Sequence, residues 1–319
     1  MNRRRTGSFF YTPAKAQDLP PAHTHQKDGV LGWIVRVIRR ICLWIGGLFL
    51  FSFCMGMLVA FVIGGGRSLP DDMILVLNVT DPIGETEHAR SITDPLASAG
   101  MTVGDLIDTL DRARDDDRVK GLLVSLDHAG LELAHIQELR TAIKRFRTSG
   151  KFAYIYTASF ADLGSGIGAY YLASAFDKIW MQPVGMVSVT GLALEMPFAR
   201  DVLDKIGVNP EFLHREEYKS AMESYTNNHM SAPNRESMQS IVDDLSQKIF
   251  TDIAADRKIP SVKLQAIIDK GLLTGDQALK DGVIDRLDYA DVLVDKTRED
   301  VTGEKDSDAL PLVTVEDYM

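Results

Sequence analysis

The longest uninterrupted apolar stretch of the chain covers residues 41–66 and contains no charged residue. As an α-helix rising about 1.5 Å per residue it would reach about 39 Å, more than the roughly 30 Å hydrocarbon core of a bilayer. The stretch ends in three glycines and Arg67 without an A-x-A-like cleavage site, which disfavours a signal peptide. A buried core helix rarely stays uncharged for so long. We therefore expect one tilted transmembrane helix at 41–66.

The remainder alternates short apolar runs with amphipathic stretches of helical period. Runs with the length of buried strands lie at 73–79, 119–126, 152–157 and 178–181. Helix-period patterns begin at Thr102, run through 136–146 to Gly150, and recur near 166–175, at 197–206 and at 231–256. Alternation of this kind predicts parallel β-α-β units in an α/β fold, and the continuous apolar runs predict a sheet covered on both faces.

Four parts follow from these patterns. We expect a basic tail at 1–40, a transmembrane anchor at 41–66, an α/β domain at 67–297, and a polar linker with the start of a further segment at 298–319. The tail carries eight Lys and Arg residues against two Asp residues. By the positive-inside rule the tail stays in the cytoplasm and the body is exported.

Charge and cysteine content narrow the classes of function. The whole chain has a formal net charge of −10 although its tail is basic, so the body is strongly acidic and nucleic-acid binding is excluded. Both cysteines, Cys42 and Cys54, fall in the apolar span, which leaves the body without disulfide or thiol chemistry. The histidines are scattered, so we expect no metal site and no cofactor.

A glycine pattern at 164–169 nominally fits the dinucleotide-binding fingerprint. That fingerprint must link a strand directly to a helix, so that a pyrophosphate meets the helix N-terminus. Here residues 158–163 intervene after the strand, and the uncharged stretch 184–191 lacks the acidic residue expected about twenty positions on. Nucleotide binding is therefore disfavoured.

Two side chains are candidates for reactive groups, and each also has a purely structural interpretation. Lys219 reads most simply as a surface lysine near a helix start; as a functional group it would be a general base, which requires burial that disfavours the ammonium. Ser165 lies between glycines at a predicted helix N-terminus. It fits a serine N-cap, and it could also stand as a nucleophile or beside an oxyanion site.

Several short motifs in a fixed order resemble the signal peptide peptidase A family in its long form, a membrane-anchored bacterial serine protease of the ClpP/crotonase-like fold. The motifs lie at 169–174, 177–180, 217–221, 273–278 and 282–285. The resemblance implies a Ser–Lys dyad in which Lys219 is the general base. It covers roughly residue 39 to the C-terminus.

The family's nucleophile does not carry over. Catalytic repeats of the family place a serine, followed by two glycines, three residues before the first aromatic of a tyrosine–aromatic pair. Counting back from Tyr170 gives Ile167. Ser165 is two positions off, which turns a helical side chain by about 200°, so only a local bulge could bring it into place. The stretch 125–130 likewise replaces the family's N-S-P-G-G loop, which helps hold the oxyanion.

The resemblance therefore implies a base-donating half of a signal peptide peptidase. The serine would come from a second repeat or from another copy in a homo-oligomer. Implied substrates are cleaved signal peptides or other extended apolar peptides, degraded at the bacterial inner membrane. The alternative is a non-catalytic, membrane-anchored module that binds peptides or assembles partners. An in-frame second repeat containing S-G-G-Y or S-G-G-W would favour the protease.

Overall fold

The computed structural model describes residues 30–63, 69–79, 83–85, 101–126, 131–161, 166–304 and 310–319. The chain divides into two compact units, residues 1–68 and 69–319, and each is described by itself. Ser165, the basic tail before residue 30 and the stretch 127–130 lie outside the described residues.

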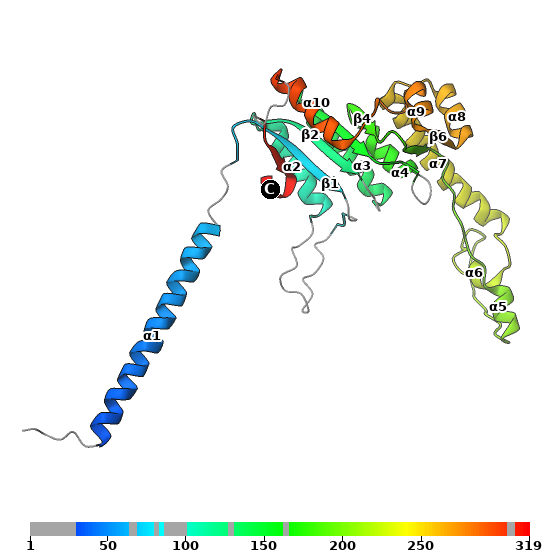
Figure 1. The fold of residues 1–319 in the computed structure, drawn as a ribbon. Coiled ribbons are helices and arrows are strands. Elements are labelled where there is room, and N and C mark those ends of the chain that lie inside the picture. Colours follow the sequence, from blue (N-terminus) through cyan, green and yellow to red (C-terminus); the bar gives the residue numbers. More distant parts are fainter. Residues whose placement is uncertain are drawn as a thin grey trace, which may run out of the picture. The chain divides into compact units, whose positions relative to one another are not determined.

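The first unit contains a single long helix, α1 (Val30–Ile63), drawn in blue in Figure 1. Its segment Trp33–Leu58 has a mean hydropathy of 2.1 and is, by length and composition, long and apolar enough to cross a membrane. The helix begins eleven residues before the predicted span, and so includes Arg36, Arg39 and Arg40. The predicted end of the span at 64–66 lies outside the described residues.

The second unit is built on a six-stranded sheet in the order β7-β4-β3-β2-β1-β8, with every neighbouring pair parallel. Its strands are β1 (Met73–Val79), β2 (Val119–Leu126), β3 (Phe152–Thr157), β4 (Lys178–Met181), β7 (Arg286–Leu287) and β8 (Leu312–Thr314). The first four have the predicted bounds. The predicted α/β class with parallel strands is therefore confirmed.

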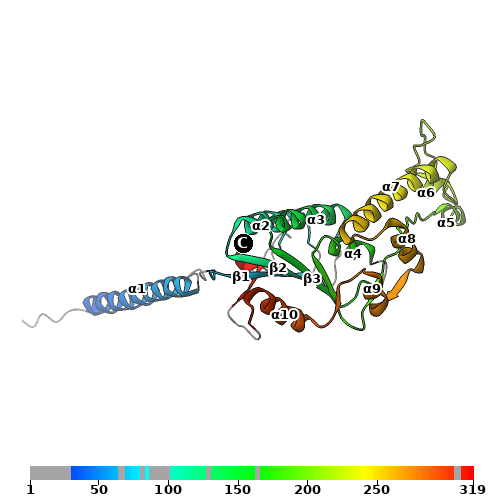
Figure 2. The same ribbon diagram turned by 90° about the horizontal axis from the view of Figure 1, so that it is seen from above.

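Helices cover both faces of this sheet, as predicted (Figure 2). On one face pack α2 (Val103–Asp115), α3 (Leu133–Arg147) and α4 (Ile167–Ala173), around a core that includes Leu106, Ile143 and Tyr170. On the other face α10 (Ala290–Thr302) places Leu293 against Trp180. The start of α2 is fixed by a capping box between Thr102 and Asp105. At the C-terminus, β8 is followed by α11 (Val315–Tyr318).

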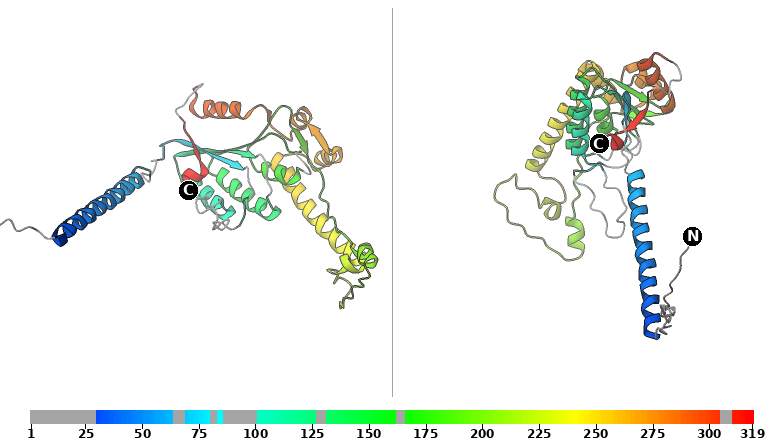
Figure 3. Two further views of the ribbon diagram at one scale, coloured as in Figure 1. Left: turned by 60° about the horizontal axis from the view of Figure 1, so that its bottom comes forward. Right: turned by 90° about the vertical axis from the view of Figure 1, so that its left-hand side faces the viewer.

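A helical arm extends from this body (Figure 3). Its longest element is α7 (Ala232–Arg257), whose C-terminal half buries Ile249 and Ile253 against the core while most of its N-terminal half is exposed or half-buried. The short helices α5 (Arg200–Lys205) and α6 (Glu223–Thr226) lie beside the far end of α7.

The base of the arm adjoins a small second sheet. Its strands β5 (Met186–Ser188) and β6 (Leu272–Thr274) are antiparallel, and α8 (Ser261–Lys270) and α9 (Gly275–Asp281) flank β6 in the sequence. From β5 the chain runs to α5 through residues 189–199, which have no regular secondary structure.

Candidate functional site

The family's nucleophile position is occupied by a core side chain. Ile167 is the first residue of α4, and only 5% of it is exposed. The preceding Gly166 packs so closely that a Cβ there would lie 1.6 Å from the carbonyl oxygen of Phe160. The described part of the α4 N-terminus therefore presents no hydroxyl at the position given by counting back from Tyr170. The structural position of Ser165 is outside the described residues.

Lys219 lies on the arm, in the loop between α5 and α6, and its side chain is exposed. Figure 1 shows α5 and α6 at the far end of the arm from α4. Within the described residues of this single chain, the structure thus does not bring Lys219 and the start of α4 together. Its role as general base is not tested by this geometry and stays a prediction.

The loop before Lys219 carries a strained backbone. Glu216 has φ 105°, in the region that favours glycine, and its carbonyl oxygen accepts a hydrogen bond from the Lys219 N–H at 3.3 Å. His214 Nδ1 lies 3.1 Å from the same oxygen. Backbone strain of this kind costs of order 1–3 kcal/mol and persists only where its surroundings hold it. The turn that presents Lys219 is therefore tightly specified.

Replacing Glu216 with glycine should relieve this strain. We expect Glu216→Gly to raise the free energy of unfolding by about 1 kcal/mol, whereas Glu217→Gly, at the next exposed position, should lower or barely change it. Urea denaturation of the purified variants measures both. A destabilised Glu216→Gly variant would show that the side chain, rather than its backbone, is what the turn needs.

Carboxylates fasten the lysine loop to the first turns of α7. Glu223 accepts hydrogen bonds from the Ser231 hydroxyl at 2.5 Å and from Asn234 Nδ2 at 2.8 Å. Tyr218, next to Lys219, donates its hydroxyl to Glu236 at 3.1 Å. Although partial burial opposes its charge, these hydrogen bonds from Ser231 and Asn234 hold the pKa of Glu223 below its ordinary value. These hydrogen bonds therefore tie the segment around Lys219 to the start of α7.

A hollow of about 260 Å³ lies between the extended segment after β5 and α7. Its lining combines apolar side chains, such as Leu192, Leu194, Met238 and Val242, with the polar side chains of Arg235 and Gln239 on α7. The chain on one side of this hollow, residues 189–199, has no regular secondary structure.

The root of α7 is joined to the body by a cluster of charges around Arg140 of α3. The Arg140 guanidinium is 3% exposed, donates to Asp256 at 2.5 Å, and stacks 3.8 Å from the ring centre of Tyr171. Tyr171, on α4, donates its hydroxyl to Asp252 at 2.5 Å. Lys144 of α3 also pairs with Asp256, and Lys248 of α7 with Asp252, each at 2.6 Å.

The hydroxyl of Tyr171 should make stability fall in alkali. Burial, together with its hydrogen bond to Asp252, raises the pKa of Tyr171 to about 12, against about 10 in an unfolded chain. Because the folded pKa is the higher one, this contribution is complete below pH of about 10 and is lost as the pH rises towards about 12. In urea denaturation from pH 8 to 12, Tyr171→Phe should lose less stability than the parent, while Tyr289→Phe, at an exposed position, should follow the parent. Equal slopes would contradict this.

A second set of contacts holds the C-terminal end of α7 against the body. Arg257 donates to Asp285 at 2.9 Å, and Asp285 also accepts the N–H of Ile179 in β4 at 2.7 Å. The hydroxyl of Tyr170 donates to the carbonyl of Val283 at 2.7 Å. Two successive tyrosines of α4 thus contact the two segments of this joint. Tyr171 contacts the charged face of α7, and Tyr170 contacts the stretch around 283–285.

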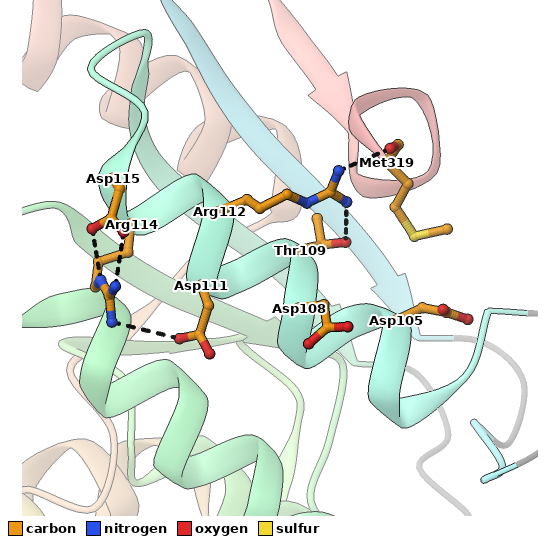
Figure 4. A pocket seen from close by; sticks show the side chains of 8 residues that line it. All are labelled: Asp105, Asp108, Thr109, Asp111, Arg112, Arg114, Asp115 and Met319. Carbon is orange, nitrogen blue, oxygen red and sulfur yellow. Dashed lines mark hydrogen bonds and ion pairs between the residues drawn. The ribbon is translucent and has the colours of Figure 1, made fainter.

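A further hollow, of about 730 Å³, lies along α2 (Figure 4). Its lining includes Asp105, Asp108 and Asp111, and Arg112 donates to the carbonyl oxygen of Met319 at 3.1 Å. No group of three or more side chains suited to a metal ion occurs among the described residues. The Arg112 hydrogen bond thus ties the C-terminal segment to α2. Lys219 does not line this hollow.

Comparison with known proteins shows which family the chain resembles. Residues 153–303 match the model of peptidase family S49. Protease 4 of Haemophilus influenzae is 29% identical over 229 residues, covering 67% of this chain and 35% of the relative. These matches support a likeness of this chain to the signal peptide peptidase A family and to peptidase family S49. The resemblance expected from the sequence is confirmed.

Further relatives in this family span bacteria and plants. Protease 4 of Salmonella typhi is 30% identical over 170 residues, covering 52% of this chain and 27% of the relative. The chloroplastic serine protease SPPA of Arabidopsis thaliana is 24% identical over 230 residues, covering 71% and 33%. The chain thus spans about a third of the length of these curated relatives.

Solved structures similar to this chain include the 1510-N membrane-bound stomatin-specific protease, which is 16% identical with a TM-score of 0.39; the match covers 77% of this chain and 98% of that one. The ClpP catalytic domain of Plasmodium falciparum is 10% identical with a TM-score of 0.37, covering 67% of this chain and 85% of that one.

Proposed function

We propose that this chain is the base-donating half of a serine endopeptidase, with Lys219 as general base and the nucleophilic serine supplied by a second repeat or another copy. The observation that carries the proposal is the pairing of a retained lysine motif at 217–221 with the buried Ile167 at the family's serine position. A scaffold has no chemical need of the lysine, and a self-sufficient protease needs a hydroxyl at the start of α4.

The exposure of Lys219 fits a site completed by a partner. A general-base lysine must be neutral when it takes the proton, and burial favours the neutral amine. The single chain leaves Lys219 on an exposed loop. Covering this loop with the repeat that brings the serine would exclude water and create the dyad in one step.

The chemistry would follow the Ser–Lys pattern. The neutral amine of Lys219 removes the proton from the partner's serine hydroxyl as its oxygen attacks the scissile carbonyl carbon. The resulting ammonium then donates that proton to the departing amine, leaving an acyl-enzyme that water hydrolyses. Donors for the oxyanion would also come from the partner, since the stretch 125–130 lacks the family's glycine-rich loop.

We further propose extended apolar peptides, and released signal peptides in particular, as substrates. The partly apolar hollow between residues 189–199 and α7 suits the side chains of such a peptide. Anchoring through α1 in the bacterial inner membrane, with the body outside the cytoplasm, would place the site where those peptides are released. The length and composition of Trp33–Leu58 support this location.

Complementation tests the proposal. The purified full chain should not cleave a fluorogenic apolar peptide by itself, and should do so when co-expressed with a serine-bearing second repeat of the same family. Cleavage by the isolated chain would refute the missing nucleophile. If the chain binds the peptide but no serine-bearing repeat restores cleavage, the result would favour the alternative, a non-catalytic peptide-binding or scaffold module.

A further inference from the structure

The arm that bears Lys219 meets the body not only through buried apolar side chains of α7 but also through a cluster of charges around the buried Arg140, and burying a charge costs free energy. Removing Arg140 and Asp256 from water costs free energy that their attraction repays only with good geometry. Apolar side chains of similar size would hold the helices together as well or better. What a planar guanidinium adds is direction, because its donors fix both the distance and the angle of their acceptors.

Arg140 has directional contacts on both sides of the joint. Towards α7 it reaches Asp256 at 2.5 Å and Asp252 at 4.0 Å, which lie one turn apart on one face of that helix. Towards α4 it donates to the Ser174 hydroxyl at 2.7 Å and to the carbonyl of Tyr171, and it stacks on the Tyr171 ring. One side chain of α3 thus fixes the register of α7 against α4.

Small errors at this joint would be magnified along the arm. From Asp252 to Ala232 the helix rises about 30 Å, so a tilt of about 10° at the joint would move its far end by roughly 5 Å. A catalytic group must be held to within about 0.5 Å of its productive place. The loop of Lys219 is fastened to that far end through Glu223 and Tyr218.

We propose that Arg140 is a positioning residue, which aims the lysine-bearing arm by locking α7 onto α3 and α4. The importance of this role for catalysis rests on the proposed function of Lys219, whereas the locking itself does not. Arg140 lies in the buried joint and contacts no substrate.

A distance measurement between body and arm tests the locking. Spin labels go on exposed positions of α3 and α5, through Glu138→Cys and Asp201→Cys, in the full chain with Cys42→Ser and Cys54→Ser. The parent should give a narrow distance distribution by pulsed electron paramagnetic resonance. In Arg140→Met we expect that distribution to widen at least about twofold, because the lever magnifies any tilt at the joint.

The matched control is Arg145→Met. Arg145 lies on the same helix and forms a close pair with Asp111 of α2, at 2.8 Å, but among the described residues it makes no hydrogen bond or ion pair with α7. Its replacement should leave the distribution unchanged. A folded Arg140→Met chain with the parent's narrow distribution would overturn the proposal, as would a parent whose distribution is already broad.

If Arg140→Met does not fold, two other variants weaken the same joint. Asp256→Asn acts from the side of α7, and Tyr171→Phe acts from the side of α4. Either should widen the distribution, and an unchanged width in both would also overturn the proposal. Lys219→Ala separates this inference from the proposed function. It should abolish cleavage in the completed enzyme with the distribution unchanged; normal cleavage by Lys219→Ala would refute the base and leave the locking intact.

Discussion

Replacing Lys219 with alanine is expected to lower peptide cleavage by the completed enzyme about a thousandfold, since general-base catalysis contributes roughly 10²–10⁴ in rate. The loss should appear in kcat, because the amine acts on the serine proton in the transition state and adds little to substrate binding. Lys219→Arg should be equally inactive, since a guanidinium keeps its proton at any pH the enzyme survives. Initial rates with a fluorogenic apolar peptide measure both variants.

Lys205→Ala is the matched control for this experiment. Lys205 is an exposed lysine of the same arm, at the end of α5. Its loss should leave kcat within about a factor of two, the size of effect ordinary for a surface substitution. Equal losses at both positions would mean that the arm needs positive charge for assembly, and would remove the chemical role of Lys219.

The second large effect concerns the start of α4. Gly166→Ala would place a Cβ 1.6 Å from the carbonyl oxygen and 2.7 Å from the carbonyl carbon of Phe160. Both are backbone atoms, so α4 or the stretch around Phe160 must move. We expect the free energy of unfolding to fall by about 3 kcal/mol, at the upper end for overpacking. Urea denaturation of the full chain in detergent measures the loss.

A glycine in open surroundings provides the comparison. No heavy atom lies within 4 Å of a Cβ built at Gly191, two residues beyond the buried Val189. Gly191→Ala should therefore change the free energy of unfolding by less than about 0.5 kcal/mol. If Gly166→Ala proves as stable as Gly191→Ala, the close approach of α4 to Phe160 is not a feature of the folded chain.

The strands of the main sheet were predictable, because the signal for each is local. Continuous apolar runs such as 73–79 and 119–126 can be buried on both sides only inside a covered parallel sheet, and both have the expected bounds. The start of α1 was harder to predict from the sequence. Arg36, Arg39 and Arg40 end the apolar run but are good helix formers, so the helix continues through them towards the N-terminus.

The candidate site was predictable only in part, because its geometry depends on contacts far apart in the sequence. Arg140 stands in a charged helical stretch and would be taken for a surface residue; its burial depends on Asp252 and Asp256, more than a hundred residues later. The exposure of Lys219 likewise follows from the arm, whose helices α5 and α6 are too short to show in a periodic pattern. What the motif around Lys219 does supply is the family.

The central claim is that this polypeptide offers the base and not the nucleophile. Labelling with a fluorophosphonate, followed by peptide mapping of the modified serine, tests it most directly. The account predicts no labelled serine in the 319-residue chain alone, and labelling of the partner's serine, dependent on Lys219, once the second repeat is present. Modification of Ser165 in the isolated chain would contradict it.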